Sequence, residues 1–184
     1  MPSKAPTNLE YALLGLLHQQ PQSGYDLRKV FATTALGNYS SSPGAIYPAL
    51  KRLESSDLVT SEIDSTTKLR PRKIFSPSRK GRAVFRTWLK ADLTPDDVAR
   101  RFDDLVLRLA FHWVLNDLEA TRVFVSALAD ELDSYVEALE SQRRQFPEQT
   151  PIQPRLALDA GIEQVKAAAR WAHKSVKKLS EERS

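Results

Sequence analysis

Residues 44–54 read GAIYPALKRLE. Apolar side chains recur in this stretch every three or four residues, as they do in a helix with one face turned to a core. These apolar positions are Ile46, Ala49, Leu50 and Leu53. Ser42 and Pro43 stand just before them, and a serine cap followed by proline at the first helical position is typical of a helix start. We therefore predict a short helix that begins at Pro43, with Ser42 as its N-cap.

The opposite face of this helix carries side chains suited to a polyanion. It presents Ala45, Tyr47, Pro48, Lys51, Arg52 and Ser55. The small residues Ser41 and Ser42 leave room at the helix start, where N–H groups and the positive dipole end favour a phosphate. Tyr47 and Lys51 lie one turn apart, so both can reach a groove of DNA. Pro48 costs about 3 kcal/mol in an ordinary helix interior; it either kinks the helix or forms an apolar wall beside a thymine methyl.

Two helices are predicted ahead of this one. Thr7 and Glu10 have the spacing of a capping box for the first, and Ser23 and Asp26 resemble a cap for the second. The apolar stripe of the first is Leu9, Ala12, Leu13, Leu16 and Leu17, and that of the second is Leu27, Val30 and Phe31. Helices this short are marginal alone, so we expect all three to share one core.

A basic hairpin is predicted after the three helices. Residues 58–63 and 72–76 are rich in Val, Ile and Phe and read as strands. Residues 64–71, which join them, are polar and cationic. Three helices followed by such a hairpin is the order of a winged helix-turn-helix. A fourth helix, residues 79–91, is expected to turn Val84, Trp88 and Leu89 inward.

Charge is divided unequally along the chain. Residues 1–92 carry 14 Lys and Arg against 7 Asp and Glu, whereas residues 93–184 carry 13 against 16. Nine basic residues and no acidic one lie from Lys68 to Lys90. A solvated helix face would explain part of this excess, but a cationic module for a polyanion explains its position beside the hairpin. We expect Lys68, Arg70, Arg72 and Lys73 to contact DNA phosphates.

Several stretches resemble the PadR family of regulators. They are ALLGLL at residues 12–17, SGYDL at 23–27, GAIYPALKRLE at 44–54, PRKIF at 71–75 and KGR at 80–82. The resemblance is strong over residues 9–92 and weak beyond. It implies a homodimeric winged-helix repressor, often relieved by a small effector molecule.

The second half predicts helices with long apolar seams. Residues 94–97 read as a cap, and the helix behind them shows Val98, Phe102, Leu105, Leu109 and Trp113. Asn116 and Glu119 are expected to cap the next helix, and the last helix follows Pro151 and Pro154. The seams comprise Leu118, Val125, Leu132 and Leu139, with Leu128 and Tyr135 between them, and then Leu158, Ile162, Val165, Ala169, Ala172, Val176 and Leu179.

Such seams need a partner helix. They can pack within one chain as a small bundle, or a second copy of the chain can complete them. Ala169 and Ala172 are small enough to allow close approach of two helices, and Trp171 lies off the seam, where it can pack across a dimer. We predict dimerisation through these helices.

The sequence contains no residue pattern that indicates catalysis. The chain has no Cys, and no Gly-rich phosphate loop, His-Glu-x-x-His or Gly-x-Ser-x-Gly motif occurs. The histidines stand singly: His18 as an exposed helix end, His112 near two aspartates as a weak metal candidate, and His173 on a solvated helix. We therefore predict no enzymatic activity, no cofactor and no metal. The polar N-terminus and the lack of an apolar run of about 20 residues predict a cytoplasmic protein without a membrane partner.

We predict a mainly α protein of two domains. Residues 1–92 form a winged helix-turn-helix that binds double-stranded DNA, and residues 93–184 form an α-helical dimerisation and effector domain. The predicted function is a sequence-specific transcriptional regulator, a homodimeric repressor on an inverted repeat, with an effector near Trp88, Phe102 or Trp113. The alternative is a winged-helix module that docks proteins, which should lack the basic hairpin tip and the pair Lys51 and Arg52.

Overall fold

The structure is a computed structural model that describes residues 5–39, 43–65 and 71–182. The chain divides into two compact units, residues 1–90 and 91–184, which we call the N-terminal and C-terminal units.

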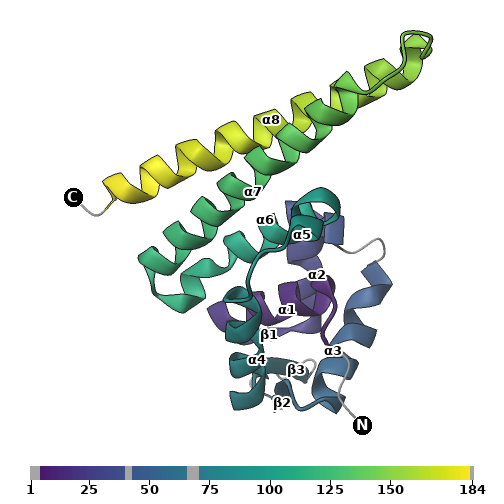
Figure 1. The fold of residues 1–184 in the computed structure, drawn as a ribbon. Coiled ribbons are helices and arrows are strands. Elements are labelled where there is room, and N and C mark those ends of the chain that lie inside the picture. Colours follow the sequence, from purple (N-terminus) through teal and green to yellow (C-terminus); the bar gives the residue numbers. More distant parts are fainter. Residues whose placement is uncertain (1–4, 40–42, 66–70, 183–184) are drawn as a thin grey trace. The chain divides into compact units, whose positions relative to one another are not determined.

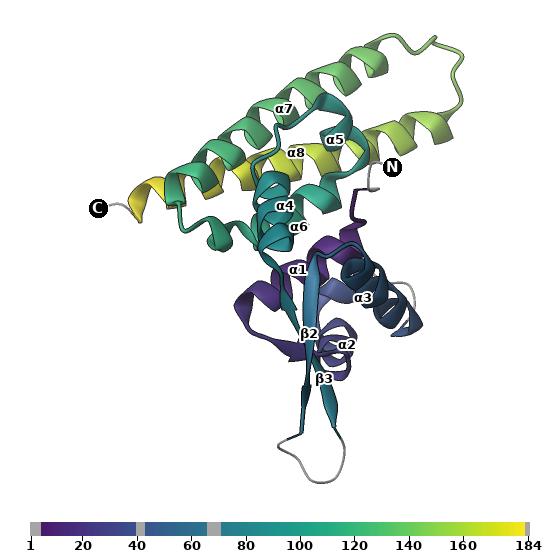
Figure 2. The same ribbon diagram turned by 90° about the horizontal axis from the view of Figure 1, so that it is seen from below.

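The N-terminal unit is a winged helix-turn-helix. Its helices are α1 (Asn8–Gln19), α2 (Gly24–Thr33), α3 (Ile46–Ser55) and α4 (Arg79–Leu89), with 3-10 turns at Ala35–Tyr39 and Pro43–Ala45. Its strands, β1 (Gln22–Ser23), β2 (Val59–Asp64) and β3 (Arg72–Pro77), form an antiparallel sheet in the order β1–β3–β2. Figure 2 shows the β2–β3 hairpin extending from the helices, whose order can be followed in Figure 1. The predicted fold class is confirmed, and β1 is an additional short strand.

Reciprocal caps begin the first two helices, as predicted. The Thr7 hydroxyl accepts from the Glu10 N–H at 3.4 Å, and the Glu10 carboxylate accepts from the Thr7 N–H at 2.8 Å. Ser23 and Asp26 make the same exchange at the start of α2. Each exchange satisfies N–H groups that a helix start leaves without an intrahelical partner.

The core of the N-terminal unit follows the predicted stripes of α1 to α3. Those stripes are buried at Ala12, Leu13, Leu16, Leu17, Leu27, Phe31, Ile46, Ala49, Leu50 and Leu53. In α4, Leu89 is fully buried as predicted, and Val84 and Trp88 are half-buried, with Trp88 stacked on Tyr11. The prediction missed Phe85, which is fully buried. The buried line of α4 is Gly81, Phe85 and Leu89.

The third helix begins later than predicted. Pro43 starts a 3-10 turn, and the α-helix has Ala45 as an N-cap without a side-chain hydrogen bond. Pro48 therefore lies in the first turn of α3, where a missing N–H costs little. This position accounts for a proline inside the apolar pattern without the interior penalty of about 3 kcal/mol that the sequence suggested.

A glycine sets the closest approach between α4 and the start of β2. A Cβ at Gly81 would lie 1.9 Å from the Leu58 carbonyl oxygen, which is backbone. The same carbonyl accepts from the Ser78 N–H at 3.0 Å. The Ser78 hydroxyl accepts from the Gly81 N–H at 2.9 Å and donates to the Asp57 carbonyl at 2.6 Å. Gly81 is thus held on both sides by hydrogen-bonded backbone.

His18 is half-buried near the end of α1, so the expectation of an exposed helix end was wrong. The cause is α4, because the His18 ring stacks on Phe85 with centroids 4.7 Å apart. Its Nδ1 lies 2.7 Å from the Leu14 carbonyl oxygen. Burial lowers the pKa of His18, against the opposing effect of the Leu14 hydrogen bond, and the charges of Arg82 and Arg86 lower it further.

This lowered pKa predicts a pH dependence of stability. The unfolded chain binds a proton at His18 near pH 6.5, whereas the folded chain binds it only at a lower pH, so stability falls as the pH drops below about 6.5. His18→Gln should flatten the decline of the melting temperature between about pH 7 and pH 5, followed by circular dichroism. An unaltered slope in His18→Gln would assign the decline to other groups.

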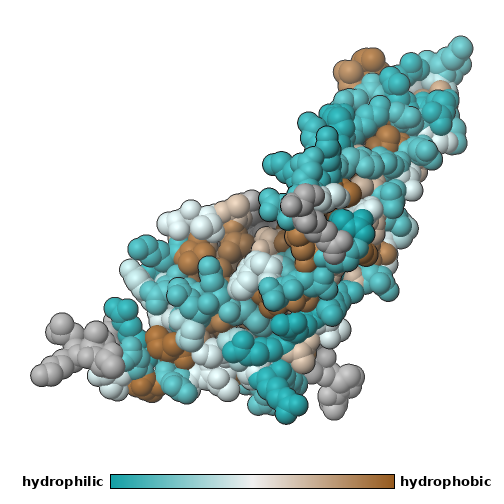
Figure 3. Space-filling view, turned by 90° about the vertical axis from the view of Figure 1, so that its left-hand side faces the viewer, coloured by the Kyte–Doolittle hydropathy of each residue, from teal (hydrophilic) through white to brown (hydrophobic). Residues whose placement is uncertain are grey.

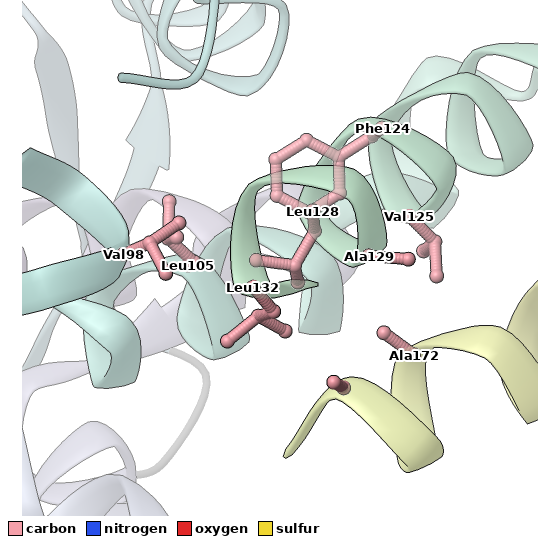
Figure 4. Close-up of a cluster of buried hydrophobic side chains, with 9 residues drawn as sticks. Val98, Leu105, Phe124, Val125, Leu128, Ala129, Leu132 and Ala172 are labelled. Carbon is pink, nitrogen blue, oxygen red and sulfur yellow. The ribbon is translucent and has the colours of Figure 1, made fainter. Parts of the chain in front are cut away.

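The C-terminal unit is helical throughout its described residues. It contains α5 (Pro95–Arg100), α6 (Phe102–Ala110), a 3-10 turn (His112–Leu115), α7 (Leu118–Arg144) and α8 (Ile152–Glu181). The long helices α7 and α8 pack side by side as an antiparallel hairpin (Figures 1 and 2). Figure 4 shows their buried cluster, in which Ala172 of α8 lies across from the apolar side chains of α7. The cluster comprises Val98, Leu105, Phe124, Val125, Leu128, Ala129, Leu132, Ala169 and Ala172.

Three predictions for this unit need correction. The helix expected behind residue 94 breaks at Arg101 and again at Phe111, and Trp113 is 53% exposed instead of buried in a stripe. The N-cap of α7 is Asp117 and not Asn116, which has a left-handed backbone (φ 51°) that ends the preceding turn. The last helix begins at Ile152, one residue after Pro151, so it contains Pro154 in its first turn.

Candidate nucleic-acid interface

The outer face of α3 is exposed, with its predicted side chains on one surface. Tyr47 is 51% exposed, and Pro48, Lys51 and Ser55 are exposed as well, whereas Ala45 is half-buried. Tyr47 and Lys51 are separated by one helical turn, so they project in the same direction. An aromatic hydroxyl beside an ammonium group can offer hydrogen bonds and charge to the floor of a groove.

Arg52 is tied to α1. Its Nε donates to Glu10 Oε1 at 2.7 Å, while the other Glu10 oxygen accepts from the Thr7 N–H. Glu10 is 6% exposed, so this ion pair is shielded on the carboxylate side. Glu10 therefore caps α1 and also fixes α3 against it, a second role that the capping pattern did not indicate. A DNA contact by Arg52 would have to use its terminal nitrogens.

Glu54 joins α3 to the hairpin in the same manner. Its carboxylate accepts from Lys73 Nζ at 2.8 Å and from the Ser61 hydroxyl at 2.6 Å. The Lys73 hydrogen bond, followed by that of Ser61, holds the pKa of Glu54 below its ordinary value. Because Ser61 is in β2 and Lys73 in β3, one carboxylate connects both strands to the helix.

The described part of the hairpin carries two basic residues on β3 and two acidic residues, Glu62 and Asp64, on β2. Arg72 and Lys73 are exposed at the start of β3, and the Lys73 ammonium also lies 5.2 Å from the Phe75 ring centroid. The antiparallel register places Ile63 opposite Lys73 and Asp64 opposite Arg72. The predicted phosphate contacts Lys68 and Arg70 lie outside the described residues, as do Ser41 and Ser42 ahead of α3.

Two further residues, Tyr25 and Arg28 of α2, are exposed, and the sequence pattern assigned them no role. Tyr25 is 57% exposed, and the Arg28 guanidinium carbon lies 5.6 Å from its ring centroid. They occupy positions i and i+3 in the first turns of α2, directly after the Ser23 cap. The sequence signal that could have identified Tyr25 and Arg28 is their position. An aromatic and a cationic residue directly after a helix cap are not needed for the buried stripe, so they indicate another role.

Residues 13–87 match the model of the transcriptional regulator PadR-like family. We call this matching segment, which spans less than half of the chain, the PadR-like domain. It begins within α1, contains α2, α3 and the hairpin, and ends within α4. The resemblance inferred from the sequence is confirmed, and the family is one of transcriptional regulators.

Relatives of the PadR-like domain include a bacterial repressor. The negative transcriptional regulator PadR of Bacillus subtilis (strain 168) is 28% identical over 121 residues, which span 65% of this chain and 65% of that protein. Crystal structures of Bacillus subtilis PadR in complex with operator DNA and with p-coumaric acid are both 20% identical to this chain, with TM-scores of 0.42. They cover 93% and 94% of this chain, and 98% and 99% of their own. Because these TM-scores are below 0.5, no residue of this chain is given a role from the two structures.

The predicted dimer seams outside the PadR-like domain pack against each other within the chain. Val125, Leu128 and Leu132 are buried in the α7–α8 cluster, and Ile162, Ala169 and Ala172 are buried on α8. Leu139, Leu158, Val165, Val176 and Leu179 are half-buried, and Leu118 is 40% exposed. This is the one-chain arrangement that the sequence left open. That these residues contribute to a dimer stays a prediction.

The predicted effector residues lie in different surroundings. Trp88 belongs to the N-terminal unit and directly follows the PadR-like domain in sequence. Its ring stacks on Tyr11, with ring centroids 4.3 Å apart. In the C-terminal unit, Phe102 meets the half-exposed Trp171 edge-on at 6.4 Å. An effector at Trp88, Phe102 or Trp113 stays a prediction.

The described ranges of the chain hold neither a metal-binding group nor a membrane-spanning helix. Within them, no group of three His, Cys, Asp or Glu side chains could hold a metal ion. His112, the candidate from the sequence, is buried and packs on Phe124 at 4.5 Å between ring centroids. No helix in the described part of the chain is both long and apolar enough to cross a bilayer.

Proposed function

We propose that this chain is a sequence-specific DNA-binding transcriptional regulator. The observation that carries the proposal is the exposed face of α3, with Tyr47 and Lys51 one turn apart on a PadR-like domain. A helix of this kind enters the major groove, where side chains meet base edges. The cationic hairpin then lies along the phosphates and supplies affinity that depends on salt but little on sequence.

The two carboxylates that tie α3 to its neighbours, Glu10 of α1 and Glu54 of α3 itself, support this division of roles. Glu10 holds Arg52, and Glu54 holds Lys73. Both ion pairs hold α3 and the hairpin in place in the absence of DNA. Less conformational entropy is therefore lost when DNA binds. Tyr47 and Lys51 are left to read the groove.

Selection of bound duplexes from a random DNA pool tests the proposal. We expect one sequence family to be enriched, and Tyr47→Ala to weaken it by about 1–3 kcal/mol relative to unrelated DNA. Lys51→Ala should also lower affinity, whereas Lys174→Ala removes the same charge from exposed α8 and should not. Equal losses on both DNAs would reduce Tyr47 to a packing or phosphate contact. Absence of any enriched sequence would favour the alternative module that docks proteins.

A homodimer on an inverted repeat is the second part of the proposal. Two copies related by a two-fold axis would read half-sites whose centres are about 10 bp, or a multiple, apart. Because the seams of α7 and α8 are buried within the chain, the partner would pack on apolar residues that remain exposed. These are Leu118, Val123, Ile152, Leu156 and Trp171. Figure 3 shows hydrophobic patches of this kind interrupting a mainly hydrophilic surface. An enriched single half-site, with a monomer mass in sedimentation, would contradict the dimer.

Repression relieved by a small effector is the third part. The name of the Bacillus subtilis relative, a negative regulator, supports repression. The aromatic side chains of Trp88 in the N-terminal unit, and of Phe102 and Trp113 in the C-terminal unit, are each suited to stack on a planar aromatic ligand. Tryptophan fluorescence during titration with p-coumaric acid tests these residues, and quenching together with DNA release is the expected result. Quenching that persists in Trp113→Phe would exclude Trp113.

A further inference from the structure

Gly24 is the first residue of α2, and its backbone does not explain why it is glycine. It follows the Ser23 cap, it is buried, and no glycine among the described residues has a positive φ. Glycine is about 1 kcal/mol less favourable than alanine in a helix interior. An alanine would therefore suit the start of α2, unless something else occupies the space of its methyl group.

The ring of Tyr47 occupies that space. A Cβ at Gly24 would lie 2.7 Å from Tyr47 Cε1 and 3.2 Å from Tyr47 Cδ1. Leu50 Cδ1 would be 3.3 Å away on the other side. Real Cβ atoms essentially never come within 3.0 Å of another heavy atom. The tyrosine ring thus rests on the bare backbone of α2.

The two neighbours of Gly24 differ in how far they can yield. Leu50 is 1% exposed and packed in the core, so it is fixed. Tyr47 is 51% exposed, and its ring can swing toward solvent about χ1 without opening a cavity. An added methyl group at Gly24 would consequently displace the ring and leave the core in place.

We propose that Gly24 is a positioning residue that sets the direction of the Tyr47 ring and thereby the DNA sequence preference of α3. The inference rests on the proposed function. Gly24 is itself buried, so it acts through Tyr47 and does not touch DNA. A ring seated against backbone holds one direction before binding, and such pre-organisation improves discrimination because less freedom is lost in the complex.

The test is a double-mutant cycle in the full chain. Gly24→Ala should reduce the ratio of affinities for selected and unrelated duplexes by at least about fivefold, the lower end of what one good base contact provides. Its melting temperature should stay within a few degrees of wild type. In the Tyr47→Ala background the same change should have no effect on the ratio, because the ring is absent. Fluorescence anisotropy with both duplexes measures all four affinities.

Gly161→Ala is the matched control. It adds the same methyl group on α8, where a Cβ meets nothing within 4 Å, and it should leave the affinity ratio unchanged. A purely structural role of Gly24 would lower the melting temperature in both backgrounds and leave the ratio alone.

The outcomes separate this inference from the proposed function. If Gly24→Ala keeps the wild-type preference for the selected duplex, the inference is overturned and the proposed function stands. A wild type without preference overturns both. If Gly24→Ala fails to fold, the Gly24→Ala/Tyr47→Ala double variant should fold again, since Tyr47 is the nearest obstacle; a double variant that stays unfolded overturns the contact.

Discussion

Gly81→Ala is expected to unfold the N-terminal unit or bring it close to unfolding. The new Cβ would lie 1.9 Å from the Leu58 carbonyl oxygen. Both backbone segments are anchored through Ser78, so neither can withdraw without losing hydrogen bonds. Overpacking typically costs 1–3 kcal/mol and occasionally more, and this contact with backbone should reach at least about 3 kcal/mol. For a unit of this size that lowers the melting temperature by at least about 12 °C.

Circular dichroism and DNA binding together measure this effect. Gly161→Ala is again the control, because it introduces a methyl group into open space and replaces a poor helix former in α8 by a good one. We expect it to raise stability by up to about 1 kcal/mol. A Gly81→Ala protein with wild-type melting would mean that α4 can move away from Leu58 at little cost.

Leu128→Ala is expected to have the largest effect in the C-terminal unit. Leu128 is fully buried at the centre of the α7–α8 cluster. Truncation of a buried leucine removes apolar contacts and leaves a cavity, at a cost of about 2–5 kcal/mol. The helical hairpin should therefore unfold at a lower denaturant concentration, as followed by the helix signal in urea.

Leu156→Ala makes the same chemical change on the surface. Leu156 is 58% exposed on α8, so within a single chain its truncation should alter stability by less than about 0.5 kcal/mol, measured at a protein concentration low enough to dissociate the proposed dimer. Equal losses in the two variants would indicate that a second chain covers Leu156. Wild-type stability in Leu128→Ala would contradict the packing of the hairpin core.

Periodicity predicted the helices of the N-terminal unit well because a buried stripe is a local property. Ile46, Ala49, Leu50 and Leu53 are all buried, as their spacing required. The caps of α1 and α2 were equally local, since each pairs residues three apart. Residues 44–54, with the other matching stretches, were specific enough to identify the PadR-like domain.

What escaped the sequence depends on contacts between distant segments. In α4, the expected inward positions were Val84, Trp88 and Leu89, but the fully buried line runs through Gly81, because a close backbone approach can be the core position of a helix. The seams of α7 and α8 specified which face is buried but not whose helix covers it, since an apolar repeat is the same for a partner in the same chain or in another. The Glu10–Arg52 pair was hidden because Glu10 already had a local explanation as a cap.

Arg52 has a consequence for anyone who wishes to retarget this protein to new DNA. A combinatorial library over α3 would normally vary every outward position, but a substitution at Arg52 leaves the Glu10 carboxylate buried without its cation, which is costly. Most members of such a library would be lost to misfolding before they met a duplex. Randomising Tyr47, Lys51 and Ser55 while retaining Arg52 and Glu54 keeps the scaffold intact. Three positions of α3 are thus open to variation for a new DNA target.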